Sequence, residues 1–510
     1  MKNRNLISLR HLLLVAIFSI SGMTFAQAPA FFNGGGGNAF WSNPDNWLDG
    51  MKPNEETPMV SITADVIVDE DVVIRSLMEA LPCSLTIQSG NKLTVNEQIS
   101  WNSGDFILED GAQLVCQHEL DVVVKKKIVA YDEGSHAWEF IASPVINPIT
   151  PSLENGFLTE PATGFNLIYF DEANRQWVDY SDTPFVIENG RGYAYINALE
   201  TILLFEGTAQ GSAVPVEVSL DYHASNGTVA GCNMVGNPLP CNVFADCSYY
   251  TLDDKGTSML AVAASTGSVI PPCRGIFAKA QSANETISFS KIEDLQDIEN
   301  QGYVEFVVGK TTAPDVAVDN AIVSFNAGDD LGKFVIFENQ PCLYFTKDNH
   351  DLAILSIDSA EVIPVKFKAA ENTSYTMRVT QKDLNLSYLH LIDNINGNNI
   401  DLLASPEYTF TASTSDYASR FKLVFRPDYG VEESVNQCFA YYANGQVRFI
   451  GLETGRDALL QIVDMNGHVA WSQAIDGGDS VCNVSALVPG IYVLRLVLTN
   501  GVMTQKIVVG

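Results

Sequence analysis

The sequence is poor in histidine and in basic residues, and it lacks the short motifs of common catalytic sites. It has 7 histidines in 510 residues and no Cys-x-x-Cys pair, so a structural zinc site has few ligands available. It contains no HExxH, GxGxxG, P-loop or G-x-S-x-G pattern, which argues against the enzyme classes that depend on them. We therefore expect a chain without catalytic activity. A glycosidase stays open as an alternative, because its two carboxylates follow no motif.

Basic residues are outnumbered two to one, with 29 Lys and Arg against 61 Asp and Glu, and the net charge is −32. This charge repels phosphate backbones, so we expect no nucleic-acid partner. Acidity of this kind favours solubility outside the cell. Asp69-Glu70-Asp71 and Asp329-Asp330 could also offer oxygen ligands to a structural calcium ion, although neither has the Asp-x-Asp-x-Asp-Gly spacing. We expect no other cofactor.

The cysteine count is odd, with nine in the chain. One or two disulfides are possible among the four that lie in one stretch, but we expect most of the nine to be small buried hydrophobic residues. The four are Cys232, Cys241, Cys247 and Cys273.

Long apolar runs are also absent, apart from one short run near the N-terminus. Basic residues precede the run at 12–20, and small residues follow it up to Ala26. This is the pattern of a secretory signal peptide over residues 1–26, with cleavage between Ala26 and Gln27. We find no other stretch near the ~18 apolar residues that a membrane helix needs, so we expect no transmembrane helix in the mature chain.

The stretch from 459 to 510 alternates apolar runs with turn residues. Residues 464–467, Asp-Met-Asn-Gly, lie between two apolar runs, and Asn-Gly favours a hairpin because both residues tolerate positive φ. Pro489-Gly490 and Asn500-Gly501 supply further turns, and residues 505–509 read as a last strand. These signals predict a small antiparallel β-sandwich.

Three motifs in this stretch carry a family resemblance. They are Asp464-x-x-Gly467, Pro489-Gly490-x-Tyr492, and Lys506 followed by apolar residues. Together they resemble the C-terminal sorting domain (type A) of Bacteroidetes proteins that leave the cell by type IX secretion. The resemblance, over residues 437–510, implies an Ig-like sandwich that the type IX machinery recognises. It also implies removal of the domain and release of the mature chain, or its anchoring on the outer-membrane surface. It names no ligand and no reaction.

Residues 27–128 hold many short runs of β-branched and apolar residues. Turns at Ser89-Gly90 and Asp110-Gly111 recur after about 20 residues, a spacing compatible with the rungs of a β-solenoid. Trp41 and Trp47 bracket a loop that resembles the leader of short β-helical segments in surface proteins of the same phylum. An antiparallel sandwich is the alternative for this domain.

Residues 129–295 contain an internal repeat. A run ending in Ser143-Pro144 or Asn237-Pro238 is followed, in each half, by an aromatic-rich run and by an Arg-Gly step at Arg191 or Arg274. The offset predicts a duplicated β-module. Glycine in the Arg-Gly step indicates a bulge or a close backbone approach. We expect the arginines to anchor strands, with ligand binding as the alternative.

Residues 303–427 read as a β-sandwich domain, and its later part resembles a domain found just before sorting domains. The whole chain is thus expected to be all-β and multidomain. Flat aromatic side chains suit sugar rings or protein partners, although core packing is the simpler interpretation. They are Trp41, Trp47, Tyr169, Trp177, Tyr180, Tyr193 and Tyr195.

These observations favour a secreted, cell-surface, adhesin-like or structural protein that is not an enzyme. A glycan or a host protein is its possible ligand. The alternative is a carbohydrate-binding protein or a glycan-active hydrolase.

Overall fold

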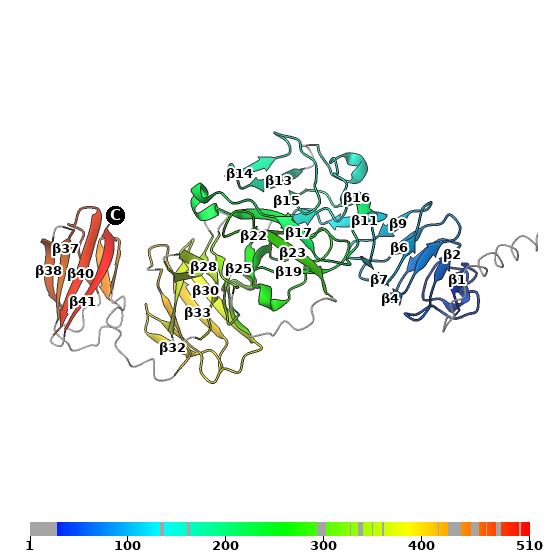
Figure 1. Ribbon diagram of the computed structural model, residues 1–510. Helices are drawn as coiled ribbons and strands as arrows, with labels where there is room; N and C mark the ends of the chain where they lie inside the picture. Colours follow the sequence, from blue (N-terminus) through cyan, green and yellow to red (C-terminus); the bar gives the residue numbers. More distant parts are fainter. Residues whose placement is uncertain are drawn as a thin grey trace, which may run out of the picture. The chain divides into compact units, whose positions relative to one another are not determined.

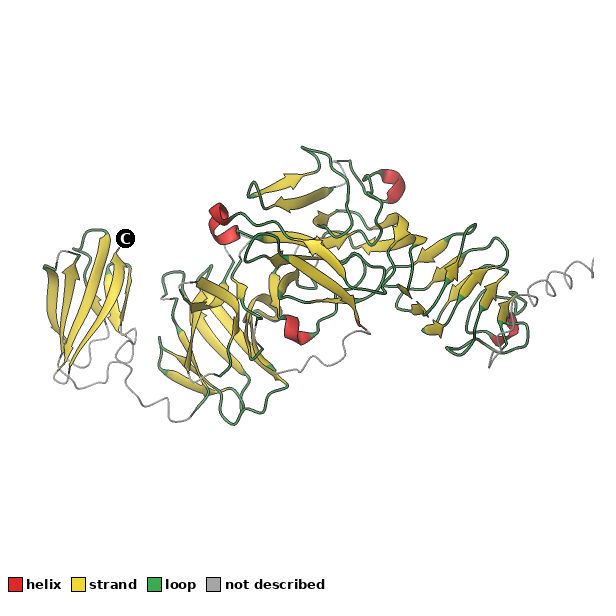
Figure 2. Ribbon diagram, viewed as in Figure 1, coloured by secondary structure: helices red, strands yellow, loops and turns green. Residues whose placement is uncertain are grey.

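The computed structural model describes residues 28–132, 137–160, 164–292, 302–326, 328–334, 340–348, 350–359, 362–416, 418–426, 440–449, 458–465, 467–475, 481–498 and 501–509. The predicted signal peptide and its cleavage site at Ala26 and Gln27 lie outside these residues. The regular structure is nearly all strand (Figure 2), so the all-β prediction is confirmed. The helical elements are short 3₁₀ segments: η1 (Pro44–Asn46), η2 (Leu153–Asn155), η4 (Ala224–Val229) and η5 (Ala264–Thr266).

The described residues include no helix with the length and hydropathy needed to cross a membrane. The chain divides into two compact units, Met1–Val124 and Lys125–Gly510. Figure 1 labels their strands, from the blue N-terminal unit to the red strands at the C-terminus.

The first unit is built from very short parallel strands. Leu85 pairs in parallel with Val66, 19 residues earlier, and with Phe106, 21 residues later. Parallel strands run along the unit in the sheets β1-β2-β5-β8 and β4-β7-β10 and in the part β3-β6-β9-β11 of a five-stranded sheet. The strands are β1 (Ala30–Phe32), β2 (Val60–Ile62), β3 (Val66–Val68), β4 (Val72–Ile74), β5 (Leu77–Glu79), β6 (Leu85–Ile87), β7 (Lys92–Val95), β8 (Ile99–Ser100), β9 (Phe106–Leu108), β10 (Gln113–Cys116) and β11 (Leu120–Ile128).

This arrangement is a β-solenoid, because the chain makes one strand in each sheet before it returns to the first. Val68, Ile87 and Leu108 stack in register in its interior and are fully buried. Gly90 and Gly111 adopt φ of +80° and +76° at the recurring turns, where a side chain would be strained. The solenoid prediction is confirmed, and the antiparallel sandwich alternative is wrong.

The middle of the chain contains the same sheet twice. Residues 139–209, called copy one, form an antiparallel sheet in the order β12-β15-β13-β14, and residues 232–291, called copy two, form one in the order β18-β22-β20-β21. A third sheet has the order β17-β23-β19. The strands are β12 (Glu139–Ala142), β13 (Asn166–Asp171), β14 (Gln176–Asp179), β15 (Gly192–Ile196), β16 (Thr201–Ala209), β17 (Val216–Ser219), β18 (Cys232–Gly236), β19 (Val243–Ala245), β20 (Tyr249–Leu252), β21 (Met259–Val262), β22 (Gly275–Lys279) and β23 (Thr286–Lys291).

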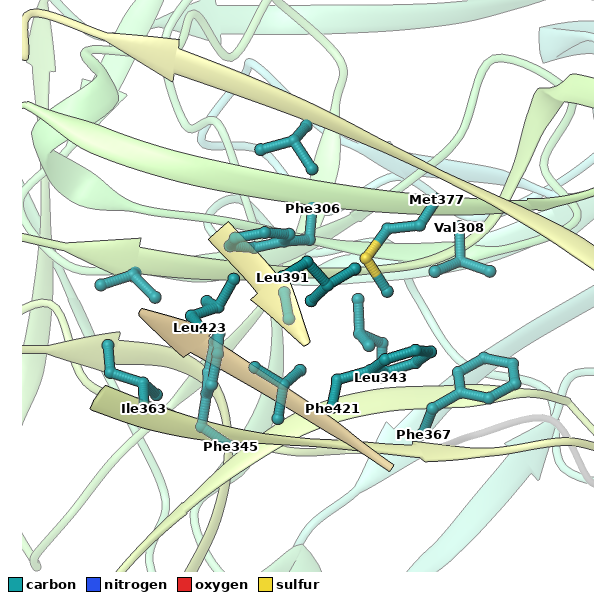
Figure 3. Packing of buried hydrophobic residues seen from close by; sticks show 14 of the residues in the cluster. Phe306, Val308, Leu343, Phe345, Ile363, Phe367, Met377, Leu391, Phe421 and Leu423 are labelled. Carbon is teal, nitrogen blue, oxygen red and sulfur yellow. The ribbon is translucent and has the colours of Figure 1, made fainter. Parts of the chain in front are cut away.

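Residues 303–425 form a long, mostly antiparallel sheet in the order β32-β31-β34-β29-β27-β28-β25-β24-β30-β33, with β26 paired to β28. Apolar residues from both ends of this order meet in one core, as Figure 3 shows for Phe306, Met377, Leu391 and Leu423. The strands are β24 (Tyr303–Lys310), β25 (Ala313–Ser324), β26 (Leu331–Gly332), β27 (Cys342–Lys347), β28 (His350–Ser356), β29 (Val362–Lys368), β30 (Thr373–Lys382), β31 (His390–Asp393), β32 (Asn398–Asp401), β33 (Glu407–Ala412) and β34 (Phe421–Val424).

The last strands form a two-sheet sandwich, as the turn pattern predicts. One sheet has the order β35-β36-β39 and the other β38-β37-β40-β41. Leu460, Leu494 and Val447 are fully buried in the core between them. The strands are β35 (Ala440–Ala443), β36 (Gln446–Phe449), β37 (Ala458–Asp464), β38 (Val469–Ile475), β39 (Val481–Asn483), β40 (Gly490–Leu498) and β41 (Gly501–Val509).

Candidate functional site

The Asp464-x-x-Gly467 motif closes the hairpin between β37 and β38. A carboxylate oxygen of Asp464 accepts a hydrogen bond of 2.9 Å from the backbone N–H of His468. The N–H of Gly467 donates to the backbone carbonyl of Asp464 at 3.0 Å, and Gly467 has a φ of +86°. A side chain that binds the backbone of its own turn, together with a residue free to adopt positive φ, explains this spacing.

The Pro489-Gly490-x-Tyr492 motif fixes the start of β40. The buried Tyr492 donates its hydroxyl hydrogen to the Val488 carbonyl at 3.0 Å, just before Pro489. A Cβ added at Gly490 would touch the Tyr492 ring at 3.5 Å. Tyrosine hydroxyls that reach back along the chain hold strand entries in other β-sandwiches too. Pro489 is exposed and Tyr492 is buried, so the motif belongs partly to the surface and partly to the core.

Lys506 is separate from the other motif residues. It pairs through its backbone with Val493 and presents its side chain to solvent on β41. Asp464, Gly467, Gly490 and Tyr492 thus shape the turns, whereas Lys506 is a surface group. Recognition of these residues by the export machinery stays a prediction.

Gln505, which the sequence analysis did not single out, joins the two sheets of this domain. Its side-chain oxygen accepts from the backbone N–H of Ala440 at 3.1 Å, and its side-chain nitrogen donates to the Ala440 carbonyl. Ala440 opens β35 in the facing sheet. The alternation along β41 could have indicated this position, because Gln505 points to the same side of the strand as the buried Ile507 and Val509.

The Arg-Gly steps of the two copies lie where the copies meet. Ile141 of copy one forms a bridge with Arg274 of copy two, and Val235 of copy two forms the reciprocal bridge with Arg191 of copy one. A Cβ at Gly275 would lie 2.9 Å from the Ile141 carbonyl oxygen, and one at Gly192 would overlap the Val235 carbonyl oxygen. Both glycines therefore allow a close backbone approach.

The Arg191 side chain does not enter that contact. Its guanidinium carbon lies 4.2 Å from the centre of the Tyr169 ring, and a guanidinium nitrogen lies 3.3 Å from the Glu188 carboxylate. The side chain is 38% exposed. The backbone of Arg191 thus contacts copy two, while its side chain forms part of a surface with Tyr169.

The predicted set of exposed aromatics divides in two. Trp41 and Trp47 are 1% and 3% exposed, and their rings pack edge to face at 4.8 Å in the solenoid. Tyr193 and Tyr195 are fully buried. An exposed sugar-stacking role is therefore wrong for these four, since their faces are covered by core neighbours. Three of the set are half-buried: Tyr169, Trp177 and Tyr180.

A small aromatic surface on copy one combines two of these residues with Phe185 and Arg191; we call it the aromatic patch. Phe185, which is half-buried, packs edge to face with Tyr169 at 4.9 Å and with Tyr180 at 5.3 Å. Trp177 belongs to the other side of the sheet, where it packs against Phe170. Of the aromatics named by the sequence, Tyr169 and Tyr180 are thus the two that lie on a partly exposed surface beside a charged side chain.

The carboxylates considered for calcium bind protein donors. Asp69 accepts from the Ser42 backbone N–H at 2.9 Å and from its hydroxyl at 2.6 Å. In the second group, Asp330 accepts from the Ser356 N–H at 2.6 Å and pairs with Lys347 at 2.9 Å. Within the described ranges, no group of three acidic, histidine or cysteine side chains is arranged to hold a metal ion. Calcium binding is thus a prediction without a formed site.

The cysteines of copy two, Cys232, Cys241, Cys247 and Cys273, are thiols in the structure. Burial raises the pKa of the Cys247 thiol to about 12 and that of Cys232 to about 11, because the apolar surroundings disfavour the thiolate. Such thiols are poor nucleophiles and poor metal ligands at neutral pH. They fit the expected role of small hydrophobic residues.

Comparisons with known proteins locate the recognisable part at the C-terminus. A search among curated proteins finds no match. Among solved structures, a biofilm-associated protein BSP domain aligns at 8% identity over 76% of this chain and 63% of its own, with a TM-score of 0.14. A tetra-tandem repeat of the extending region of a large adhesion protein aligns at 10% identity over 77% of this chain and 100% of its own, with a TM-score of 0.10.

TM-scores this low carry no argument about fold or role, and the chain spans less than two thirds of the first structure. The family model for the secretion system C-terminal sorting domain matches residues 443–510. That range contains all three motifs and most of the two-sheet sandwich. The C-terminal part of this chain is therefore a type IX sorting domain of the kind carried by secreted Bacteroidetes proteins.

Proposed function

We propose that the chain is a structural or adhesive protein of the cell surface, without enzymatic activity, that reaches the outer-membrane exterior by type IX secretion. The observation that carries this proposal is the sorting domain at residues 443–510. Before it, the solenoid buries its own interior residues, and the two copies of the duplicated module share one hydrophobic core. Rigid β-modules of this kind suit a role in holding and presenting a surface. In this proposal the sorting domain is removed after export and the mature chain is anchored outside.

Export is tested by shortening the chain in cells of the native host. Removal of residues 505–510 deletes most of β41, including the Gln505 contact with Ala440 and the exposed Lys506. We expect the shortened protein to accumulate in the periplasm, measured by fractionation and by protease treatment of intact cells. A matched control replaces Val481, an exposed residue of β39 that lies outside the three motifs, with threonine. Normal surface display of the chain without residues 505–510 would remove the basis of the proposal.

The aromatic patch supports a second candidate, a carbohydrate-binding protein. Half-buried Tyr169, Tyr180 and Phe185 offer apolar edges and faces, and the partly exposed Arg191 and Glu188 offer hydrogen-bonding groups beside them. Sugar rings are bound by aromatic faces together with polar neighbours of this kind. A carbohydrate ligand would make the surface protein an adhesin.

Binding is tested on glycan and host-matrix arrays with the full secreted chain. If the patch binds, Phe185→Ala should weaken the interaction about tenfold or more, the loss of about 1.4 kcal/mol or more. Leu153→Ala is the control, because Leu153 is exposed at η2 in the same copy and outside the patch. Equal binding by both variants would exclude the patch. Release of shortened glycans by the unmodified chain would instead favour the hydrolase alternative.

A further inference from the structure

The four-stranded sheet of the sorting domain has one side packed in the core and one side that carries apolar residues into solvent. By alternation along β40, Tyr492, Leu494 and Leu496 face the core and are buried. The residues between them face outward. We call this side of the β38-β37-β40-β41 sheet the outer face. Its larger apolar members are Leu459, Val463, Val469, Ile491, Val493, Val497 and Val508.

These apolar residues are neighbours across the strands. Val463 of β37 pairs with Val493 of β40 and with Val469 of β38. Ile491 pairs with Val508 on β41. Side chains at paired positions on one face of a sheet lie about 4.5–5.5 Å apart at Cβ. Ile491 and Val493 are two residues apart on β40 and face the same side, so they join these two groups into one patch.

Several members of the patch are well exposed. The exposed fractions are 42% for Ile491, 52% for Val469 and 65% for Val508. A strand that is apolar on both sides is usual where both faces of a sheet are covered. Contiguous exposed apolar patches on soluble domains mark interaction sites. The outer face thus has the composition of a surface that becomes covered.

The charged residues at the described positions of the outer face are basic. Arg495 and Lys506 are both exposed. Val469, Val463 and Val493 are paired across β38, β37 and β40, and we call them the valine row. Lys506 pairs with Val493 at the end of this row. Lysine on an edge strand such as β41 is a common protection against edge-to-edge pairing. That explanation does not apply to Arg495, which lies on the internal strand β40. The chain as a whole has a net charge of −32, so a basic surface is an exception to its composition.

We propose that the outer face, with its valine row and the pair Arg495 and Lys506, is the surface by which the sorting domain docks on the export machinery. Its occupant is a protein of that machinery with an apolar centre flanked by carboxylates. The inference rests on the proposed function, because it assigns a surface to the export step. Apolar contact supplies the affinity, and the two basic groups orient the partner by charge complementarity.

The opposite sheet provides matched controls. Arg448 and Val481 are exposed residues of β36 and β39, and they pair with each other. Arg448→Glu and Val481→Thr therefore make the same kinds of substitution, one residue in each variant, on the other side of the sandwich. The tested variants are the pair Arg495→Glu with Lys506→Glu and, separately, the pair Ile491→Thr with Val508→Thr.

Each variant is made in the full chain and expressed in the native host, and export is measured as the ratio of surface-displayed to periplasmic protein. Thermal unfolding of the purified full chain checks folding. We expect either outer-face pair to lower export about tenfold, with unfolding temperatures near that of the unmodified chain. Because all four side chains are exposed, these substitutions leave the core intact. The two control variants should be exported normally.

The results separate this inference from the proposed function. Normal export of both outer-face pairs, while removal of residues 440–510 blocks export, overturns the docking surface and leaves the export proposal standing. Export of the chain without residues 440–510 overturns both. Equal loss in the outer-face and control variants shows a general sensitivity of the domain and also overturns the docking surface. Normal export with loss of a dimer in sedimentation assigns the face to a second copy of the chain, which again contradicts the proposal.

Discussion

Copy one and copy two share a strand order but differ in the residues they place at equivalent points. In both, the first strand pairs with the last of four, at β12 with β15 and at β18 with β22. The same side of each sheet contributes to a common core. There the ring centres of Phe140 and Phe170 of copy one lie 5.7 and 6.1 Å from that of Phe277 of copy two. The reciprocal bridges at the Arg-Gly steps join the copies again. The shared features are those that hold the two copies together.

The differences appear on strands β13 and β20, which are equivalent in register. Copy two places the buried Tyr250 there, which donates to the Gly332 carbonyl at 2.7 Å and accepts from the Phe334 N–H at 3.1 Å. In copy one, Ile168 occupies the position equivalent to Tyr250. The next residue of copy one is the half-buried Tyr169, which is equivalent to Thr251 of copy two. Burial raises the pKa of Tyr250 well above its usual value, so its hydroxyl stays protonated.

This comparison teaches that the duplication separates two tasks. Copy two makes the hydrogen-bonded joint to residues 303–425 through Tyr250. Both copies contribute to the core there, since Phe277 of copy two and Phe170 of copy one each pack against Phe334. Copy one leaves an aromatic and guanidinium surface half open to solvent. We infer that copy two is constrained by packing, and that copy one is the part in which a binding surface is compatible with the fold.

The largest expected effect tests the reciprocal contact through its two glycines. Gly192→Ala should lower the free energy of unfolding by about 2–3 kcal/mol and Gly275→Ala by about 1 kcal/mol, because added atoms in a tight contact force the backbone apart. The order follows from geometry: a Cβ overlaps the Val235 oxygen at Gly192 but lies 2.9 Å from the Ile141 oxygen at Gly275. Urea unfolding followed by tryptophan fluorescence measures both. If Gly275→Ala destabilised the protein as much as Gly192→Ala, or more, the contact at Gly192 would not be the tighter of the two.

A second, smaller effect tests the role of copy two as a joint. Tyr250→Phe removes the hydrogen-bond partner of both the Gly332 carbonyl and the Phe334 N–H. It should lower the free energy of unfolding by about 1–3 kcal/mol. Tyr180→Phe in copy one is the control. Tyr180 is half-buried and donates to the Pro151 carbonyl at 3.2 Å, a bond that water can replace, so less than about 1 kcal/mol is expected. A larger loss for Tyr180 than for Tyr250 would contradict the division of tasks.

The sequence predicted what depends on local pattern. The recurring turns at Gly90 and Gly111 predicted the solenoid, because each rung repeats the same positive φ. The Arg-Gly steps predicted a close approach at Gly192 and Gly275. The sequence did not identify the approaching backbone, since Val235 and Ile141 are distant in the chain and only the packed duplicate brings them near.

Residues whose environment is set by distant strands were predicted least well. Trp41 and Tyr193 read as possible binding residues, yet both are buried by parts of the fold that no local pattern reveals. In the sorting domain the motif residues Asp464 and Tyr492 were visible from spacing. Gln505 was not, because its partner Ala440 lies 65 residues away in the facing sheet. The outer face could have been predicted from the sequence of β40, because apolar residues there point to both sides of the sheet.

The smallest expected effect concerns the segment between the copies, which a buried carboxylate ties to copy one. Glu172 follows β13 and accepts from the N–H groups of His223 and Gly231 at 3.0 and 2.9 Å. It also accepts from the Asn226 amide and lies 2.5 Å from the His223 ring nitrogen. The Glu172 hydrogen bond raises the pKa of His223, and the nearby Asp221 and Asp171 act in the same direction. Burial alone would raise the pKa of Glu172, but these donors lower it overall.

The sign of the pH dependence follows from these two shifts. Because the folded-state pKa of His223 is raised, its contribution is fully present below the unfolded value of about 6.5 and is lost as pH rises through the folded pKa. The contribution of Glu172 is present above its unfolded value and is lost as pH falls through its lowered pKa. The difference in unfolding temperature between the unmodified chain and His223→Ala should thus shrink from pH 6 to pH 9. A gap for His223→Ala that stays constant with pH would mean that the protonated imidazole does not hold the segment to copy one, and that the backbone N–H groups bound to Glu172 are sufficient.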